Sequence, residues 1–210
     1  MSDLELCYLP ATEAIAQFKA KTLSPVELLD ALIKRAEEVE PVINAFTYRH
    51  FDEAMDKAKK AEAKYASGKR TRALEGLPIG IKDENLIKGK PTSSGSLIMK
   101  DFVADRTSVG NERILRAGGI VHARTATPEF SSAGYTNSRL WGVTRNPWNP
   151  EFTPGGSSGG TAASLAAGTS AIATGSDIGG SIRIPAGTCG LVGYKPPYGR
   201  NSDDPPFNLD

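Results

Sequence analysis

Apolar residues at helical spacing dominate the first 70 positions of the chain. The clearest helix start is at Ser24, whose side chain suits an N-cap and is followed by Pro25 at the first helical position. Glu27 stands three residues after Ser24, the spacing of a capping box. Apolar side chains then recur every three or four residues as far as Pro41, which we expect to end this helix.

The same spacing predicts two further helices in this part of the chain. A shorter one covers about residues 12–21, and a half-exposed one rich in alanine and lysine begins near Phe51 and ends at Gly68. We therefore expect residues 1–70 to be a helical segment that packs on the outside of a larger core.

The pattern changes after residue 76, where short apolar runs alternate with helical spacing. Residues 136–154 are polar and contain several prolines, so we expect a loop there. The order of the remaining elements predicts an α/β layer. These elements are strands at 77–81, 120–123 and 172–174 and helices at about 107–117 and 161–167.

Composition and charge exclude several classes of function. The 210 residues include 25 basic and 24 acidic side chains, a net charge of +1, which gives no electrostatic reason to bind nucleic acid or a membrane. Two cysteines, Cys7 and Cys189, are too few for a disulfide framework. We see neither a secretory signal nor a run of about 18 apolar residues, so a cytoplasmic location is expected by default.

The 22 glycines are concentrated after residue 155, where two glycine pairs enclose Ser157 and Ser158. A flexible loop is one interpretation, but helical sequence follows directly. A phosphate loop requires a lysine after the last glycine, and Thr161 stands there. The nucleophile elbow of α/β-hydrolases requires a preceding core strand and a histidine base. Residues 149–154 do not read as a strand, and His50 and His122 both read as structural or solvated.

A hydroxyl nucleophile in this chain therefore requires another base. A lysine can act as one if burial or a nearby positive charge lowers its pKa by about 3 units. Lys82 is the candidate, because it stands at the end of an apolar strand and its amine could point into a cleft. From the residues alone, a solvated lysine is the more ordinary interpretation of this position.

Residues 155–185 closely resemble the signature of the amidase signature family. The resemblance rests on the paired serines, on the block Asp177-x-Gly179-Gly180-Ser181-x-Arg183-x-Pro185, and on the 24-residue step from Ser157 to Ser181. Residues 76–83, 125–130 and 146–148 resemble further landmarks of the family in the same order. The resemblance implies an α/β fold with a mixed β-sheet core flanked by helices. Residues 71–210 would form the N-terminal part of this α/β domain, which is expected to continue beyond residue 210.

The resemblance also implies a catalytic triad. Ser181 is the nucleophile, Ser157, held by a cis peptide bond, relays the proton, and Lys82 is the base. Backbone N–H groups at the turn before the nucleophile form the oxyanion hole, from Ile178, Gly179, Gly180 and Ser181. No metal and no cofactor is implied.

Other positions receive lesser roles from the same resemblance. Ser158 and Ser176 support the hydrogen-bond network, and Asp177 and Arg183 fix the loop. The entrance for the substrate is lined by Ser131, Ser132, Gly134 and Tyr135. Glu84-Asn85-Leu86 is an unusual continuation of Lys82-Asp83, which leaves the triad intact but alters the pocket wall.

Three functions follow as hypotheses. The first is hydrolysis of a small-molecule amide, or of a related carbamate or urea. The second is the amidase subunit of a tRNA-dependent amidotransferase, although residues 127–130 look like those of stand-alone amidases. The third is an inactive fragment, because members of the family are longer than 210 residues. Expected partners are a homodimer mate, a second chain or the missing C-terminal half, and the proline-rich end at 196–210 reads as a connection to such a part.

Overall fold

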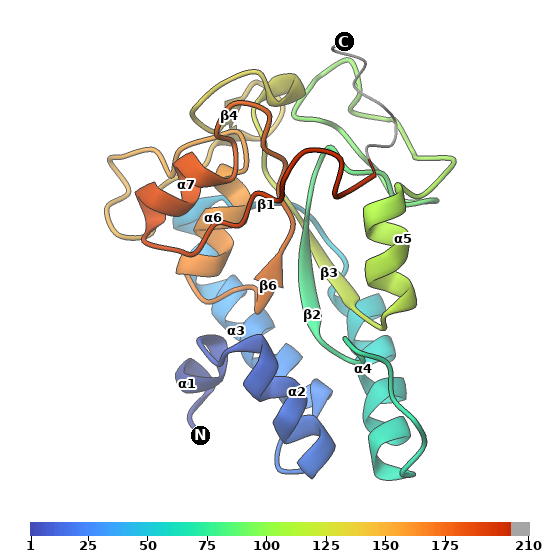
Figure 1. Cartoon of the computed structure of the whole chain (residues 1–210). Helices are drawn as coiled ribbons and strands as arrows, with labels where there is room; N and C mark the ends of the chain where they lie inside the picture. The colour runs from blue at the N-terminus through green and yellow to red at the C-terminus, as the bar shows by residue number, and fades with distance from the viewer. Residues whose placement is uncertain (203–210) are drawn as a thin grey trace.

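A mixed four-stranded sheet forms the centre of the computed structural model, which describes residues 1–202 (Figure 1). The two central strands, β2 (Pro78–Lys82) and β3 (Ile120–Thr125), are parallel and buried along their whole length. Strand β6 (Ile172–Ala173) lies parallel to β2, and β1 (Phe46–Arg49) lies antiparallel to β3, which gives the order β1-β3-β2-β6. The predicted mixed sheet flanked by helices is confirmed.

The sequence explains why β2 and β3 occupy the centre. Parallel strands that are covered on both faces tend to be apolar throughout. Strand β2 is apolar as far as Ile81, and β3 begins with Ile120 and Val121 but also buries His122 and Arg124. Their register pairs Lys82 with Thr125, so the carboxyl ends of the two strands meet at one edge of the sheet. Polar side chains at these ends are thereby brought together.

The predicted helices of the N-terminal segment are present as α2 (Ala11–Ala20), α3 (Pro25–Ile43) and α4 (Phe51–Ala66). The capping box of α3 is complete: the N–H of Glu27 donates to Ser24 Oγ at 3.1 Å, and the N–H of Ser24 donates to the Glu27 carboxylate at 2.8 Å. Both interactions satisfy amide groups that a helix start would otherwise leave unpaired.

The prediction that Pro41 ends this helix is wrong, because α3 continues to Ile43. A proline in the last turn removes a single hydrogen bond, and two features of the folded structure outweigh that loss. Ile43 is buried in a cluster with Phe46, and the N–H of Asn44, in a left-handed conformation, closes the turn on the Glu40 carbonyl at 3.0 Å.

The first 70 residues are also not purely helical. Strand β1 joins the sheet from within this segment, and a short helix, α1 (Asp3–Cys7), begins at a second capping box on Ser2. Four residues are too few for a strand to show a clear alternation of apolar and polar side chains. The division of the chain near residue 70 remains a prediction.

Beyond β2 the predicted helices are confirmed as α5 (Val109–Arg116) and α6 (Gly159–Ala166). The expected loop at 136–154 contains a two-stranded hairpin, β4 (Asn137–Ser138) with β5 (Gly142–Val143). Two further elements were not predicted. They are the single turn η1 (Glu129–Ser131) and helix α7 (Arg183–Cys189).

Figure 1 shows α7 next to α6, and the two helices are in contact. Of the expected connection at 196–210, residues 203–210 lie outside the described residues. Within residues 1–202, none of the helices has the length and apolar character that crossing a membrane requires.

Leu29 joins α3 to the sheet, since it is fully buried against Ala54 and Ala58 of α4 and Ile120 of β3. We predict that Leu29→Ala lowers the free energy of unfolding by about 2–5 kcal/mol, the usual cost of such a cavity. Urea titration of the two proteins measures the difference. The matched control is Val42→Ala in the same helix, whose half-exposed side chain should change stability by less than about 1 kcal/mol. Equal effects of both variants would contradict this packing.

Candidate active site

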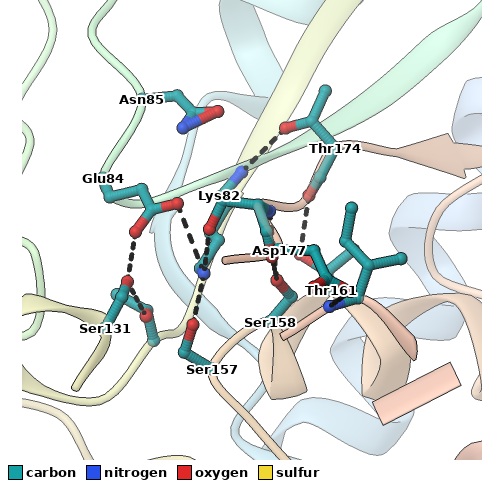
Figure 2. Close-up of polar contacts among 12 residues, drawn as sticks. Lys82, Glu84, Asn85, Ser131, Ser157, Ser158, Thr161, Thr174 and Asp177 are labelled. Atoms are coloured by element: carbon teal, nitrogen blue, oxygen red, sulfur yellow. Dashed lines mark hydrogen bonds and ion pairs between the residues drawn. The ribbon is translucent and has the colours of Figure 1, made fainter. Parts of the chain in front are cut away.

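The amine of Lys82 is the centre of a polar cluster at the carboxyl end of β2. Its side chain is 0% exposed, and Nζ donates hydrogen bonds to Ser157 Oγ at 2.7 Å and to Ser176 Oγ at 2.8 Å (Figure 2). The backbone N–H of Lys82 donates to Thr174 Oγ1 at 3.2 Å. The structure therefore brings together three side chains that lie up to 94 positions apart in the sequence.

Burial lowers the pKa of Lys82 below the ordinary value for a lysine. The charged form loses its hydration, and this effect exceeds the opposing attraction of Glu84 and Asp177. The amine can therefore lose its proton more readily than a solvated lysine and can act as a base. An exposed, solvated lysine is the wrong interpretation of this position.

The glycine-rich segment 155–160 is buried and leads into α6, so it is not an exposed linker. The peptide bond between Gly156 and Ser157 is cis, as the resemblance implied. A Cβ atom at Gly156 would lie 2.6 Å from the backbone N of Tyr135 and 2.7 Å from the carbonyl O of Ala133. A glycine is required there because two backbone segments meet without room for a side chain.

Ser181 lies beside this segment and is connected to it through the backbone. The N–H of Ser158 donates to the Ser181 carbonyl at 3.1 Å. Among the hydrogen bonds of residues 1–202, none involves Ser181 Oγ, so its hydroxyl is not joined to Ser157. Two predicted members of the triad are thus in contact, and the third is a neighbour whose hydroxyl is not engaged.

The N–H groups of the turn before Ser181 differ in their use. The N–H of Gly180 donates to Asp177 Oδ1 at 2.7 Å, so this amide already has a partner, and its role as an oxyanion donor stays a prediction. In the described part of the chain, the N–H groups of Ile178, Gly179 and Ser181 have no hydrogen-bond acceptor. These three amides are the ones that remain for a ligand.

Asp177 holds this turn together. Arg183 binds its carboxylate with Nε at 3.0 Å and Nη2 at 2.8 Å, and the backbone N–H groups of Ile182 and Arg183 also donate to it. The guanidinium and these amides keep the pKa of Asp177 well below its usual range. Nearby, the N–H of Ser176 donates to Ser158 Oγ at 3.3 Å. These contacts fix the turn, and the supporting roles of the four residues in catalysis stay predictions.

The four residues expected at the substrate entrance are not equivalent. Ser131 Oγ donates to the Glu84 carboxylate and thereby lies one side chain away from Lys82. Ser132 Oγ turns back to its own loop and donates to the Glu129 carbonyl at 2.8 Å. Tyr135 is 56% exposed.

Glu84 is the site residue that sequence reasoning missed. One carboxylate oxygen lies 3.3 Å from Lys82 Nζ, and the other accepts the hydrogen bond from Ser131. Glu84 lies in the turn directly after β2, where the N–H of Asn85 donates to the Lys82 carbonyl at 3.1 Å, so strand alternation offered no signal for it. It was seen from the sequence only as an unusual residue.

Among the described residues, neither histidine forms a hydrogen bond with Ser157 or Ser181. His122 is buried in β3, its Nε2 lies 2.9 Å from the Thr169 carbonyl O, and burial lowers its pKa to about 4. Burial likewise lowers the pKa of His50 to about 4. Within the part of the chain that the structure describes, no cluster of histidine, cysteine, aspartate or glutamate could hold a metal ion.

Comparisons with known proteins find a matching family model and similar proteins. The family model described as Amidase matches residues 27–208. The A subunit of glutamyl-tRNA(Gln) amidotransferase from Synechococcus sp. (strain CC9605) is 43% identical over 186 residues, which are 89% of this chain and 38% of that protein. The corresponding protein of Carboxydothermus hydrogenoformans is 40% identical over 93% of this chain and 40% of its own length. The chain thus spans about two fifths of these relatives.

Solved structures also match the fold of this chain. Fatty acid amide hydrolase matches with a TM-score of 0.84 and 31% identity, over 88% of this chain and 32% of that one. A bacterial aryl acylamidase of the amidase signature enzymes matches with a TM-score of 0.81 and 34% identity, over 85% of this chain and 37% of that one.

Burial of neutral His122 predicts a specific pH dependence of stability. Its folded pKa of about 4 lies below the unfolded value near 6.5, so its contribution is complete above about pH 6.5 and is lost as the pH falls towards 4. Relative to His122→Gln, the protein should lose about 2 kcal/mol of unfolding free energy between about pH 7 and about pH 5. Urea titrations at both pH values measure the difference. A constant difference between the two proteins would contradict the buried neutral state.

Proposed function

Because the chain belongs to the amidase family, the amidase signature enzymes, we propose that it carries the machinery of an enzyme that hydrolyses a carbon–nitrogen bond of a small amide. In this proposal Ser181 is the nucleophile, Ser157 relays the proton and Lys82 is the base. Carbamates and ureas belong to the same substrate class, because they present the same carbonyl carbon to the nucleophile.

The buried amine of Lys82 carries the proposal. It contacts Ser157 Oγ at 2.7 Å, and burial favours its neutral form. A neutral amine in this place has one chemical use that its surroundings support, which is to accept a proton from a hydroxyl. His122 contacts Thr169, and neither His122 nor His50 forms a hydrogen bond with Ser157 or Ser181 in the described residues, so neither competes with Lys82 as the base.

The proposed reaction begins when the hydroxyl of Ser181 turns towards Ser157. Lys82 Nζ takes the proton of Ser157 Oγ while Ser157 takes the proton of Ser181, whose Oγ bonds to the carbonyl carbon. The electron pair of the C=O bond moves to the oxygen, which the N–H groups of Ile178, Gly179 and Ser181 can stabilise. Collapse of this intermediate breaks the C–N bond, and the relay returns the proton to the leaving nitrogen.

The resulting acyl-enzyme is an ester of Ser181. A water molecule, deprotonated through the same relay, attacks this ester and releases the acid, which restores the Ser181 hydroxyl. The protons taken up by Lys82 in each half-reaction are returned before the next one. These steps use only the side chains and amides named above.

A second candidate is the amidase subunit of a tRNA-dependent amidotransferase, with the same chemistry directed at glutamine. The observation that favours it is the 43% identity to the glutamyl-tRNA(Gln) amidotransferase chain of Synechococcus. Residues 127–130 favour the stand-alone amidase by resemblance. Glutamine hydrolysis that depends on added partner subunits would favour the second candidate, and hydrolysis of simple amides without them the first.

The proposal predicts graded losses of turnover. Ser181→Ala should remove amide hydrolysis, because no bond to the carbonyl carbon can form. Lys82→Ala should lower kcat by about 10²–10⁴-fold, the usual contribution of a general base. Ser157→Ala should cause a large loss that leaves residual activity. Release of amine or ammonia from a panel of small amides measures all three.

Ser67→Ala is the control for these variants. This serine lies on the surface at the end of α4, where its Oγ donates to the Lys64 carbonyl at 2.9 Å, so its loss should leave turnover unchanged. Full activity of Ser181→Ala would contradict the mechanism, and so would an equal loss in the control.

A further inference from the structure

Glu84 connects the amine of Lys82 to a second segment of the site. Its Oε1 lies 3.3 Å from Lys82 Nζ, and its Oε2 accepts a hydrogen bond from Ser131 Oγ (Figure 2). Ser131 in turn lies 2.9 Å from Thr127 Oγ1, between the two hydroxyl oxygens. The proposed reaction gives this carboxylate no proton to transfer and no bond to form.

We propose that Glu84 is a positioning residue that holds the Lys82 amine against Ser157 and supplies the negative charge that faces this amine. The inference rests on the proposed function only in treating Lys82 as the base.

The other groups around Lys82 do not supply this charge. Ser157 and Ser176 contribute neutral hydroxyls. Asp177 attracts the amine from the opposite loop, but its carboxylate is bound by Arg183 and by backbone N–H groups. Among the ion pairs of residues 1–202, the basic partner of Glu84 is Lys82 itself.

The backbone on both sides of Glu84 is held by Arg124, which is fully buried in β3. Its Nη2 donates to the Lys82 carbonyl at 3.2 Å and to the Asn85 carbonyl at 2.6 Å, and it lies 3.7 Å from the Asp83 carboxylate. The carboxylate of Glu84 therefore starts from a fixed backbone and is fixed again at its tip by Ser131. Such double anchoring is what a positioning role requires.

The charge of Glu84 has a defined effect on the base. A carboxylate in contact with an amine favours the protonated form, so Glu84 raises the pKa of Lys82 against the larger lowering by burial. Glu84→Gln removes the charge and keeps the shape of the side chain. Burial and the charge of Asp177 should then be the remaining influences on the pKa of Lys82. The amine of Glu84→Gln should then lose its proton at lower pH than the amine of the unaltered protein.

The test is a direct titration of Lys82 by NMR in protein whose lysines carry ¹³C at Cε. The resonance of Lys82 is identified by its absence from Lys82→Met, and its chemical shift is followed with pH. We expect a lower titration midpoint for Lys82 in Glu84→Gln than in the unaltered protein. The readout requires no turnover, so it separates a failure of this inference from a failure of the proposed function.

Two further variants complete the experiment. Ser131→Ala removes the anchor of the carboxylate tip and should lower the midpoint in the same direction, which decides the matter if Glu84→Gln does not fold. Glu112→Gln removes a carboxylate that pairs with Arg116 on the surface of α5, and it should leave the midpoint unchanged. An unchanged midpoint in folded Glu84→Gln, or in folded Ser131→Ala if Glu84→Gln fails to fold, would overturn the inference.

Discussion

The enclosure of one lysine amine by serine hydroxyls is the interaction on which the rest of the site depends. Lys82 closes a strand that is buried along its whole length, so its side chain cannot reach solvent. An unpaired polar group in such a place would cost several kcal/mol, and hydrogen bonds to Ser157 and Ser176 offset that cost. The same burial that makes these bonds necessary also shifts the amine towards its neutral form.

This constraint explains the small residues of the serine segment. The segment has to pass close to the sheet for Ser157 to meet the amine, and its backbone packs directly against other backbone. Thr136 binds both ends of the serine segment, since its Oγ1 donates to the Gly155 carbonyl at 2.9 Å and accepts from the Gly159 N–H at 3.1 Å. A Cβ atom at Gly159 would lie 2.1 Å from this oxygen, which leaves no room for any residue but glycine.

The central elements of the fold could be predicted because their signals are local. The capping box at Ser24 and the apolar runs of β2 and β3 each lie within a few neighbouring residues. The end of α3 was wrong at Pro41 because burial of Ile43, a tertiary contact, outweighs the local effect of a proline. Strand β1 was missed because its four residues are defined by pairing with β3, which no short sequence window contains.

In the site, too, some residues could be predicted from the sequence and others could not. Lys82, Ser157 and Ser181 were predicted as the triad through a family pattern. The position of Lys82 at the end of a strand suggested a buried stem with its amine in a cleft, but the burial of the amine itself is shown only by the structure. The state of the Gly180 amide could not be read from the sequence, because it depends on how the Asp177 carboxylate is oriented by Arg183. Glu84 was recognised only as unusual, since its importance comes from contacts with Lys82 and Ser131 across the site.

The most direct test of the account is the rate at which a fluorophosphonate modifies the protein as a function of pH, with the adduct located by mass spectrometry. The account predicts a single adduct on Ser181, formed at a rate that rises as one group loses its proton below the ordinary pH range of a lysine. It also predicts that this dependence disappears in Lys82→Met. An adduct on another residue, or an unchanged pH dependence in Lys82→Met, would contradict the role of Lys82 as the base.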